Sequence, residues 1–313
     1  MSLERALALA DAARGIAYPN PTVGAVVVAP DGATLGEGVT EAWGGRHAEL
    51  VALAAAGEKS RGATLFVTME PCAHRGLTPP CVDAIVEAGI AQVVAACTDP
   101  NEKARGGLDT LRAAGIDVVL DERSDAKRQN EAWRTWVSAG RPFVTLKLAV
   151  SLDGRVVVPG RRWVTGEASR TRVHELRAAS DAVAVGMGTV RADAPRLDAR
   201  DVEVVRQPRR LAFGRGPLPD GSELELRTGA LTDELAALAA DGVQSLLLEG
   251  GPTLGAAFVE AGLVDRLLLH VAPVLAGEGP HVLGSFTPPV ELHELSAEQA
   301  GRDVVLRADR AAP

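Results

Sequence analysis

The sequence predicts an α/β protein built from two domains, residues 1–140 and 141–313. Its 313 residues suit two domains of about 150 residues each. In both halves, short apolar segments typical of strands alternate with segments that carry apolar residues at helical spacing. The stretch Ala139-Gly140-Arg141-Pro142 separates the halves, because a helix should end before the proline and a new apolar strand begins just after it.

The first half begins with an apolar strand at 23–29, which returns through the hairpin signal Asp31-Gly32 to a second strand at 34–39. A helix is expected over 47–56, where apolar residues recur at helical spacing until a glycine follows. The other elements expected here are strands at 63–69, 92–97 and 116–120, and helices at 80–88, 108–114 and 125–136.

The second half repeats this alternation with a different sequence. Its expected strands are 143–150, 182–186, 245–249, 264–271 and 303–307, and its expected helices are 167–179, 233–240 and 254–261. In α/β sheets, ligands usually bind where strands give way to helices. Ligand-binding sites are therefore expected at these strand-to-helix turns.

Composition narrows the class of protein. A chain that is 46% hydrophobic and 24% charged is an ordinary globular protein, which excludes wholesale disorder and collagen. A net charge of −8 and only 3% aromatic residues argue against a nucleic-acid partner. No apolar run is long enough to span a membrane, and no signal peptide is visible. Three cysteines, an odd number, favour a reducing, cytoplasmic location, and a homo-oligomer stays open.

One imidazole and two thiols form a candidate zinc site in the first half: His47, Cys72 and Cys81. Three protein ligands leave one tetrahedral position for water, which is the pattern of catalytic rather than structural zinc. Each of these cysteines follows a proline, so we expect both in the first turn of a helix, where the dipole favours thiolate. Cys97 ends an apolar strand and is expected in the core. The prediction is one zinc ion per chain.

Glu49 lies two residues after His47, a spacing that does not place both side chains on one helix face. We therefore expect it to act as a proton shuttle rather than as a ligand. A His-x-Glu motif with Pro-Cys and a second cysteine is the arrangement of zinc-dependent nucleobase deaminases, although here eight residues separate the cysteines. A lone histidine or cysteine is more often a cap or a core residue, but the joint pattern favours the metal.

A second candidate site lies at residues 246–254, Leu-Leu-Leu-Glu-Gly-Gly-Pro-Thr-Leu, where a strand meets a helix. Small residues there let a phosphate approach backbone N–H groups, and Thr253 is the expected helix cap. The sequence has no P-loop and no complete Gly-x-Gly-x-x-Gly. Many strand-Gly-Gly-helix turns bind nothing, so the pattern alone leaves that alternative open.

Specific segments of the first half resemble the bacterial riboflavin-biosynthesis deaminase-reductase family. The run Pro-Cys-Ala-His-Arg-Gly-Leu-Thr-Pro-Pro-Cys at 71–81 resembles that family's long zinc loop, and 18–24 resemble its His-Pro-Asn-Pro-x-Val-Gly segment. Asp-Pro-Asn at 99–101 also matches. The resemblance implies a cytidine-deaminase-like three-layer domain with zinc, in which Asn20 binds the base. The alternative for Asn20 is a turn residue within Pro-Asn-Pro.

The second half resembles the same family's reductase, which implies a dihydrofolate-reductase-like domain that binds NADPH. The matching segments are 146–154, 162–165, 185–190, 196–200 and 249–253. The cofactor residues that this implies are Ala149, Trp163, Thr189, Asp193, Gly251, Pro252, Thr253, Leu254, Gly255, Ala256 and Ala257. The implied substrate residues are Arg177, Leu197, Arg200 and Glu249.

Residue chemistry agrees with part of this assignment. Arg177 and Arg200 suit a ribose phosphate, and Glu249 suits a sugar hydroxyl or an exocyclic amine. Lys147 joins the predicted substrate site, because an ammonium on an apolar strand is rare unless it is paired. The alternatives are a solvated helix face for Arg177, plain packing for Trp163 and a solvent-facing edge position for Lys147.

The resemblance implies two reactions of riboflavin synthesis. The first is zinc-dependent hydrolytic deamination of 2,5-diamino-6-ribosylamino-4(3H)-pyrimidinone 5′-phosphate. The second is NADPH-dependent reduction of the ribosyl side chain to ribityl.

The sequence departs from the family pattern at three positions. Tyr18 replaces a histidine, Ala194 replaces an aspartate, and Leu77 stands where Arg or Lys is common. Leu77 cannot hold a substrate phosphate, so Arg75 is the substitute cation or binding is weaker. One alternative is the same two-domain plan acting on another purine- or pyrimidine-derived metabolite. The other is a catalytically dead nucleotide-binding regulator, against which the complete zinc set with Glu49 argues.

Overall fold

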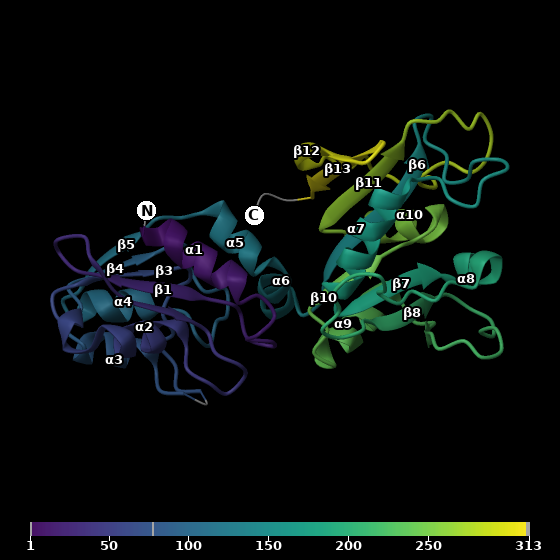
Figure 1. Cartoon of the computed structure of the whole chain (residues 1–313). Helices are drawn as coiled ribbons and strands as arrows, with labels where there is room; N and C mark the ends of the chain where they lie inside the picture. Colours follow the sequence, from purple (N-terminus) through teal and green to yellow (C-terminus); the bar gives the residue numbers. More distant parts are fainter. Residues whose placement is uncertain (1, 77, 311–313) are drawn as a thin grey trace. The chain divides into compact units, whose positions relative to one another are not determined.

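The computed structural model describes residues 2–76 and 78–310, which divide into two compact units between Ala139 and Gly140 (Figure 1). The first unit holds a mixed sheet with strand order β2-β1-β3-β4-β5. Its strands are β1 (Gly24–Val28), β2 (Thr34–Val39), β3 (Thr64–Val67), β4 (Gln92–Ala95) and β5 (Asp117–Leu120). Its helices are α1 (Ser2–Ala12), α2 (Ala48–Ala56), the 3₁₀ helix Gly57–Ser60, α3 (Cys81–Glu87), α4 (Gly107–Ala113), α5 (Ser124–Gln129) and α6 (Glu131–Ala139).

Alternation along β1 divides the first unit into three layers. Ala25 and Val27 face the main core, whereas Val26 and Val28 pack against Ala6 of α1. Figure 1 shows α1 and α5 on one side of the sheet and α2, α3 and α4 on the other. The predicted three-layer α/β domain is therefore confirmed. Strands β3, β4 and β5 run parallel, so their carboxyl ends lie at one edge.

Helix α2 lies directly against β2 because that strand carries glycines where the two elements meet. A Cβ atom built on Gly36 would lie 2.3 Å from the Ala52 carbonyl oxygen, and one on Gly38 would lie 2.3 Å from that of Ala48. No side chain fits at either position. This close approach fixes the start of α2, where His47 is the capping residue.

The second unit holds a sheet of order β12-β13-β11-β6-β10-β7-β8-β9. Its strands are β6 (Phe143–Ser151), β7 (Ala182–Gly186), β8 (Arg209–Phe213), β9 (Glu225–Arg227), β10 (Ser245–Leu248), β11 (Arg266–Ala272), β12 (His293–Ala300) and β13 (Asp303–Asp309). Its helices are α7 (Glu167–Ala178), α8 (Met187–Asp193), α9 (Leu231–Ala240) and α10 (Pro252–Glu260).

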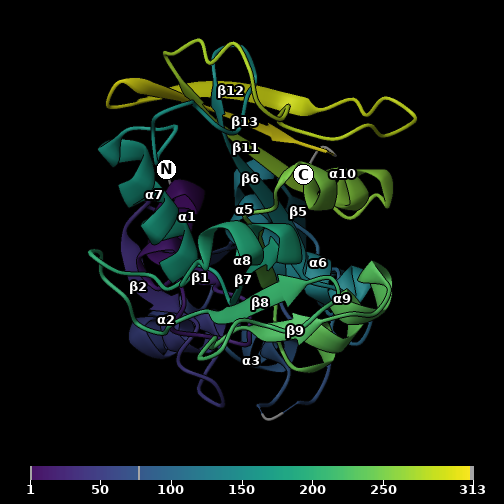
Figure 2. The same ribbon diagram turned by 90° about the vertical axis from the view of Figure 1, so that its right-hand side faces the viewer.

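Strands β11, β6, β10, β7, β8 and β9 of this sheet run parallel, and β13 and β12 extend it in antiparallel fashion. Figure 2 shows α7 and α10 on opposite sides of the sheet at β6. Leu146 of β6 packs with Phe258 of α10 on one face, and Val183 and Leu247 pack near Leu176 of α7 on the other. The connection from β6 leads past β10 to β7, whereas the connection from β10 leads past β6 to β11. Because these neighbouring strands connect in opposite directions, their carboxyl ends form a topological switch point.

Several elements differ from the sequence prediction. The expected helix at 125–136 is two helices that are interrupted at Asn130. The Asn130 side-chain amide accepts a hydrogen bond from the Thr22 backbone N–H and donates one to the Thr22 carbonyl oxygen, each 2.9 Å long. Elements α1, α8, β8, β9 and β12 were not predicted. Strand β9 has only three residues and β12 is exposed on nearly all of its length, so neither carries an apolar signal.

Over the described residues, no helix combines the length and apolar character needed to cross a membrane.

Candidate active sites

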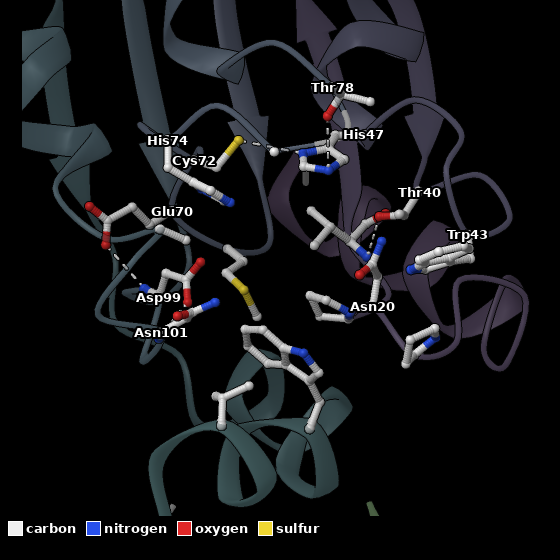
Figure 3. A pocket seen from close by; sticks show the side chains of 18 of the residues that line it. Asn20, Thr40, Trp43, His47, Glu70, Cys72, His74, Thr78, Asp99 and Asn101 are labelled. Carbon is white, nitrogen blue, oxygen red and sulfur yellow. Dashed lines mark hydrogen bonds between the residues drawn. The ribbon is translucent and has the colours of Figure 1, made fainter. Parts of the chain in front are cut away.

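The three predicted zinc ligands converge at the carboxyl edge of β3. His47 caps α2, Cys72 lies in the loop after β3, and Cys81 is the first residue of α3. The Nδ1 atom of His47 lies 3.2 Å from the Cys81 sulfur and 3.5 Å from the Cys72 sulfur. All three ligand atoms lie within 4.8 Å of one another. Figure 3 shows two of the three ligands, His47 and Cys72, at one end of the cavity.

These separations fit a tetrahedral zinc ion. Zn–S bonds of about 2.3 Å and a Zn–N bond of about 2.0 Å hold nitrogen and sulfur about 3.5 Å apart. A soft donor set of two sulfurs and one imidazole also suits zinc rather than a hard cation. The Cys81 thiol, followed by the His47 ring, lowers the pKa of Cys72 to about 4, so one thiolate forms readily.

The expectation that both cysteines begin helices is half right. Cys81 opens α3, but Cys72 is in an irregular loop, because its neighbouring backbone groups pair with distant segments. The Ala73 N–H donates to the Ala104 carbonyl oxygen at 3.1 Å, and the Cys72 carbonyl oxygen accepts from the Val82 N–H at 3.4 Å. Gly107 makes room for this loop, since a Cβ atom there would lie 1.7 Å from the Pro71 carbonyl oxygen. Leu77 lies outside the described residues. Cys97 is fully buried and is absent from the metal-ligand group, as expected for a core residue.

Glu49 is almost entirely buried and lines the same cavity as His47 and Cys72. Burial raises the pKa of its carboxyl group to about 7. A carboxyl group with a pKa near neutrality can both take up and release a proton, which is what a proton shuttle requires.

The cavity lined by His47, Cys72 and Glu49 has a volume of about 370 Å³, large enough for a heterocycle. Asn20 lines it, and its backbone N–H also closes a turn onto the Ala17 carbonyl oxygen. Figure 3 shows Asn20 and Thr40 on one side of the cavity and Asp99 and Asn101 across from them, with His47 at the far end.

The sequence prediction did not include Glu70, which organises the cavity wall that carries Asp99 and Asn101. The buried Glu70 carboxylate accepts hydrogen bonds from the backbone N–H groups of Asp99 (3.0 Å), Gly106 (2.9 Å) and Leu108 (3.2 Å). It therefore ties the loop after β4 to the start of α4. The one available signal was an acidic residue directly before Pro71-Cys72, which by spacing alone is not distinguishable from a surface residue.

Metal analysis tests the ligand assignment. Cys72→Ser and Cys81→Ser each remove a soft ligand and should lose zinc, whereas the buried Cys97→Ala variant should bind as much zinc as the wild type. Full zinc content in both serine variants would contradict the assignment.

In the second unit, Arg177 of α7 faces Glu249 at the end of β10. Two hydrogen bonds of 2.6 and 3.0 Å join the guanidinium to the carboxylate, and Arg177 also donates to the Asp198 carbonyl oxygen. Burial would raise the pKa of Glu249, but the guanidinium outweighs this effect and holds that pKa below its usual range. Arg177 is thus not on a solvated helix face, and its donors are largely engaged within the protein.

Lys147 is half-buried near this pair on β6, which lies between β11 and β10, so the alternative of a solvent-facing edge position is excluded. Burial lowers the pKa of its ammonium group, partly offset by the Glu249 carboxylate. Arg200 is partly exposed and bonds to Asp198 at 2.8 Å. The Leu197 side chain is only 2% exposed and lies in the core cluster with Val183.

The glycine-rich turn after β10 forms an open helix start. Gly251 is the capping residue of α10 and Pro252 occupies its first turn, so the expectation of Thr253 as the cap is wrong. Proline suits the first position, where no N–H bond is needed. A Cβ atom on Gly251 would meet only the Thr189 hydroxyl, at 3.4 Å, so backbone N–H groups remain approachable. This open cradle fits a dinucleotide phosphate.

The other predicted cofactor residues lie on several elements of the second unit. Ala149 lies on β6, Asp193 ends α8, and 254–257 continue α10. Trp163 is 52% exposed rather than packed, with the Arg162 and Arg170 guanidinium groups 5.1 and 5.8 Å from its ring centre.

A His/Cys/Cys group beside a buried glutamate, followed by a second α/β unit with an open phosphate cradle, defines a class of protein that joins a zinc-dependent deaminase to a nucleotide-dependent reductase. Residues 2–97 match the family model described as the cytidine and deoxycytidylate deaminase zinc-binding region. Residues 142–306 match the RibD C-terminal domain.

Relatives match across both units. The riboflavin biosynthesis protein RibD of Mycobacterium tuberculosis is 41% identical, covering 94% of this chain and 92% of its own length. RibD of Escherichia coli is 37% identical, covering 88% of each chain. The solved structure of Acinetobacter baumannii RibD matches with a TM-score of 0.86 and 34% identity, covering 99% of this chain and 98% of that one.

A Thermotoga maritima structure titled diaminohydroxyphosphoribosylaminopyrimidine deaminase/5-amino-6-(5-phosphoribosylamino)uracil reductase matches with a TM-score of 0.83 and 32% identity, covering 99% of this chain and 98% of that one. The chain belongs to the RibD family, the bifunctional deaminase-reductases of riboflavin biosynthesis. Its cofactors are zinc in the deaminase domain and NADPH in the reductase domain.

Proposed function

We propose that the chain acts on a pyrimidine ribosylamino 5′-phosphate in two steps, deaminating the ring in the first unit and reducing the ribosyl side chain to ribityl in the second. The observation that carries the first step is the convergence of His47, Cys72 and Cys81 beside one cavity. Buried Glu49 and Asn20 line that cavity together with His47 and Cys72. The Thermotoga maritima relative, whose title names both activities, supports the substrate class.

In the deaminase site, His47, Cys72 and Cys81 are the zinc ligands. Zinc, when bound there, supplies a Lewis acid that makes water nucleophilic near neutral pH. Glu49 takes the proton from the attacking water and passes it to the departing amino group, a role that its pKa near 7 supports. The Asn20 amide pairs with the edge of the heterocycle and orients the ring.

In the reductase site, the cofactor lies along the carboxyl edge of the sheet. NADPH, when bound, supplies the hydride that reduces the sugar carbon. The start of α10, from Gly251 to Ala257, holds the cofactor phosphates with Thr189 beside it, and Ala149, Trp163 and Asp193 complete its binding site.

Charged residues hold the sugar phosphate of the second substrate. Arg177 fixes the Glu249 carboxylate, which accepts hydrogen bonds from the sugar hydroxyls, and Lys147 donates to the same sugar. The partly exposed Arg200 binds the phosphate, and Leu197 contributes backbone contacts at the side of the site.

The proposed setting is the cytoplasm, with small-molecule substrates and no nucleic-acid or membrane partner. The zinc ligands support a reducing compartment, because Cys72 and Cys81 must stay thiolates and all three cysteines are free.

Incubation of the purified protein with the diaminopyrimidinone phosphate, followed by mass analysis, tests this function. Without NADPH the expected product is the deaminated pyrimidine alone, and with NADPH it is the deaminated ribityl compound. If the substrate remained unchanged with zinc present, the proposed substrate would be wrong.

A further inference from the structure

Tryptophan is concentrated at the deaminase cavity. The chain contains four tryptophans, and three of them, Trp43, Trp133 and Trp136, line this one cavity. Aromatic residues make up only 3% of the sequence. Core packing accounts for Trp136, which packs against the core cluster of the first unit. Trp133 is 7% exposed and belongs to the core cluster of the first unit. Trp43 requires a different explanation.

Trp43 is 61% exposed at the cavity wall. An indole carries a large apolar surface that is usually buried in a core or an interface. It lies on the loop between β2 and α2, four residues before His47. Figure 3 shows it on the same side of the cavity as Asn20 and Thr40, opposite Asp99 and Asn101.

The loop that carries Trp43 is a closed turn. Gly45 donates its backbone N–H to the Ala42 carbonyl oxygen at 2.8 Å, and Glu41 donates to that of Arg46 at 3.0 Å. The Glu41 carboxylate also accepts hydrogen bonds from the Arg46 backbone N–H (2.8 Å) and from its guanidinium (2.7 and 3.2 Å). These bonds hold both ends of the turn together, so the turn itself positions the exposed indole.

We infer that the indole of Trp43 stacks on the face of the substrate's pyrimidine ring and is a specificity-determining residue of the deaminase site. This inference rests on the proposed function and adds to it, since Asn20 recognises the edge of the ring and Trp43 recognises its flat face. A planar π-system beside an exposed indole gains both apolar burial and stacking. Non-planar metabolites cannot make this contact.

The stack predicts a particular kinetic signature. The indole touches the ring face and not the departing amino group, so its loss should weaken substrate binding without slowing the chemical step. Trp43→Ala should therefore raise KM for deamination at least about fivefold, the lower end for one aromatic contact to a base, and leave kcat within about twofold. Trp43→Phe keeps a π-face and should restore most of the affinity.

Steady-state kinetics of the deamination step with the diaminopyrimidinone phosphate, on zinc-loaded full-length protein, measures this. Val119→Ala is the matched control, because Val119 is an exposed apolar residue of the same unit on β5 and does not line the cavity. It should match the wild type in both parameters. Zinc content is measured for every variant, so that a disturbed His47 is recognised separately.

Unchanged KM in Trp43→Ala, or a fall in kcat alone, would overturn the inference, because the loop would then serve only to place His47. If Trp43→Ala loses zinc, Trp43→Phe and Trp43→Leu decide instead. Equal KM values for these two zinc-loaded variants would overturn the stack, and a higher KM for leucine would support it. If the wild type did not deaminate the substrate, the proposed function itself would be contradicted. If the wild type deaminates it, the comparison of the Trp43 variants tests the stack alone.

Discussion

Glu49→Gln should lose about 10²- to 10⁴-fold of the deamination rate, the range of general acid–base catalysis, while it keeps its zinc. Glutamine has nearly the same shape and can still accept a hydrogen bond, but it cannot take up or release a proton. The Glu49 side chain lines the cavity beside the His/Cys/Cys group but is not one of the three ligands, so the substitution removes no metal ligand.

Deamination rate and zinc content, measured on the same preparation, check this expectation. Glu58→Gln is a suitable control, because Glu58 is an exposed carboxylate of the same unit that does not line the cavity. A fully zinc-loaded Glu49→Gln variant within about threefold of the wild-type rate, well below the catalytic range, would show that another group moves the proton.

Gly251→Val should weaken NADPH binding about 10- to 100-fold, because the added side chain stands where the cofactor phosphates approach the start of α10. The backbone and the space around Gly251 admit a Cβ atom. Gly251 has an extended backbone, with φ −71° and ψ 175°, which branched residues adopt. A Cβ atom there meets only the Thr189 hydroxyl at 3.4 Å.

Titration of NADPH fluorescence against the folded variant measures this effect. Ala240→Val adds a branched side chain at the exposed end of α9 and should bind NADPH as the wild type does. Wild-type affinity in Gly251→Val would place the cofactor phosphates elsewhere on the second unit.

The zinc site was predictable because the residue types and their short spacings define its chemistry. His47 and Glu49 lie at one helix start, and a proline precedes both Cys72 and Cys81, so the ligand set followed from the sequence. The alternating strands and helices of both units followed from apolar periodicity. The fold of Cys72 in a loop did not, because the space for that loop is provided by Gly107, some 35 residues away.

Features that depend on long-range pairing escaped the sequence. The break at Asn130 arises from bonds to Thr22, which lies 108 residues away. Glu70 organises the wall of the cavity through backbone groups on later loops. The burial of Leu197, in a chain segment that reads as a surface loop, is likewise decided by its packing near Val183. No local pattern records which distant backbone a polar or apolar side chain will meet.

Separation of the two half-reactions tests the central claim, that two independent sites in two units carry out the two steps. The measurement is NADPH oxidation by Glu49→Gln, supplied with the already deaminated pyrimidine and checked for folding by circular dichroism. The zinc group lies wholly before residue 82 and the cofactor cradle lies after residue 145, so reduction should proceed at the wild-type rate. If the folded variant failed to oxidise NADPH with this substrate, a single shared site would have to replace the two-site account.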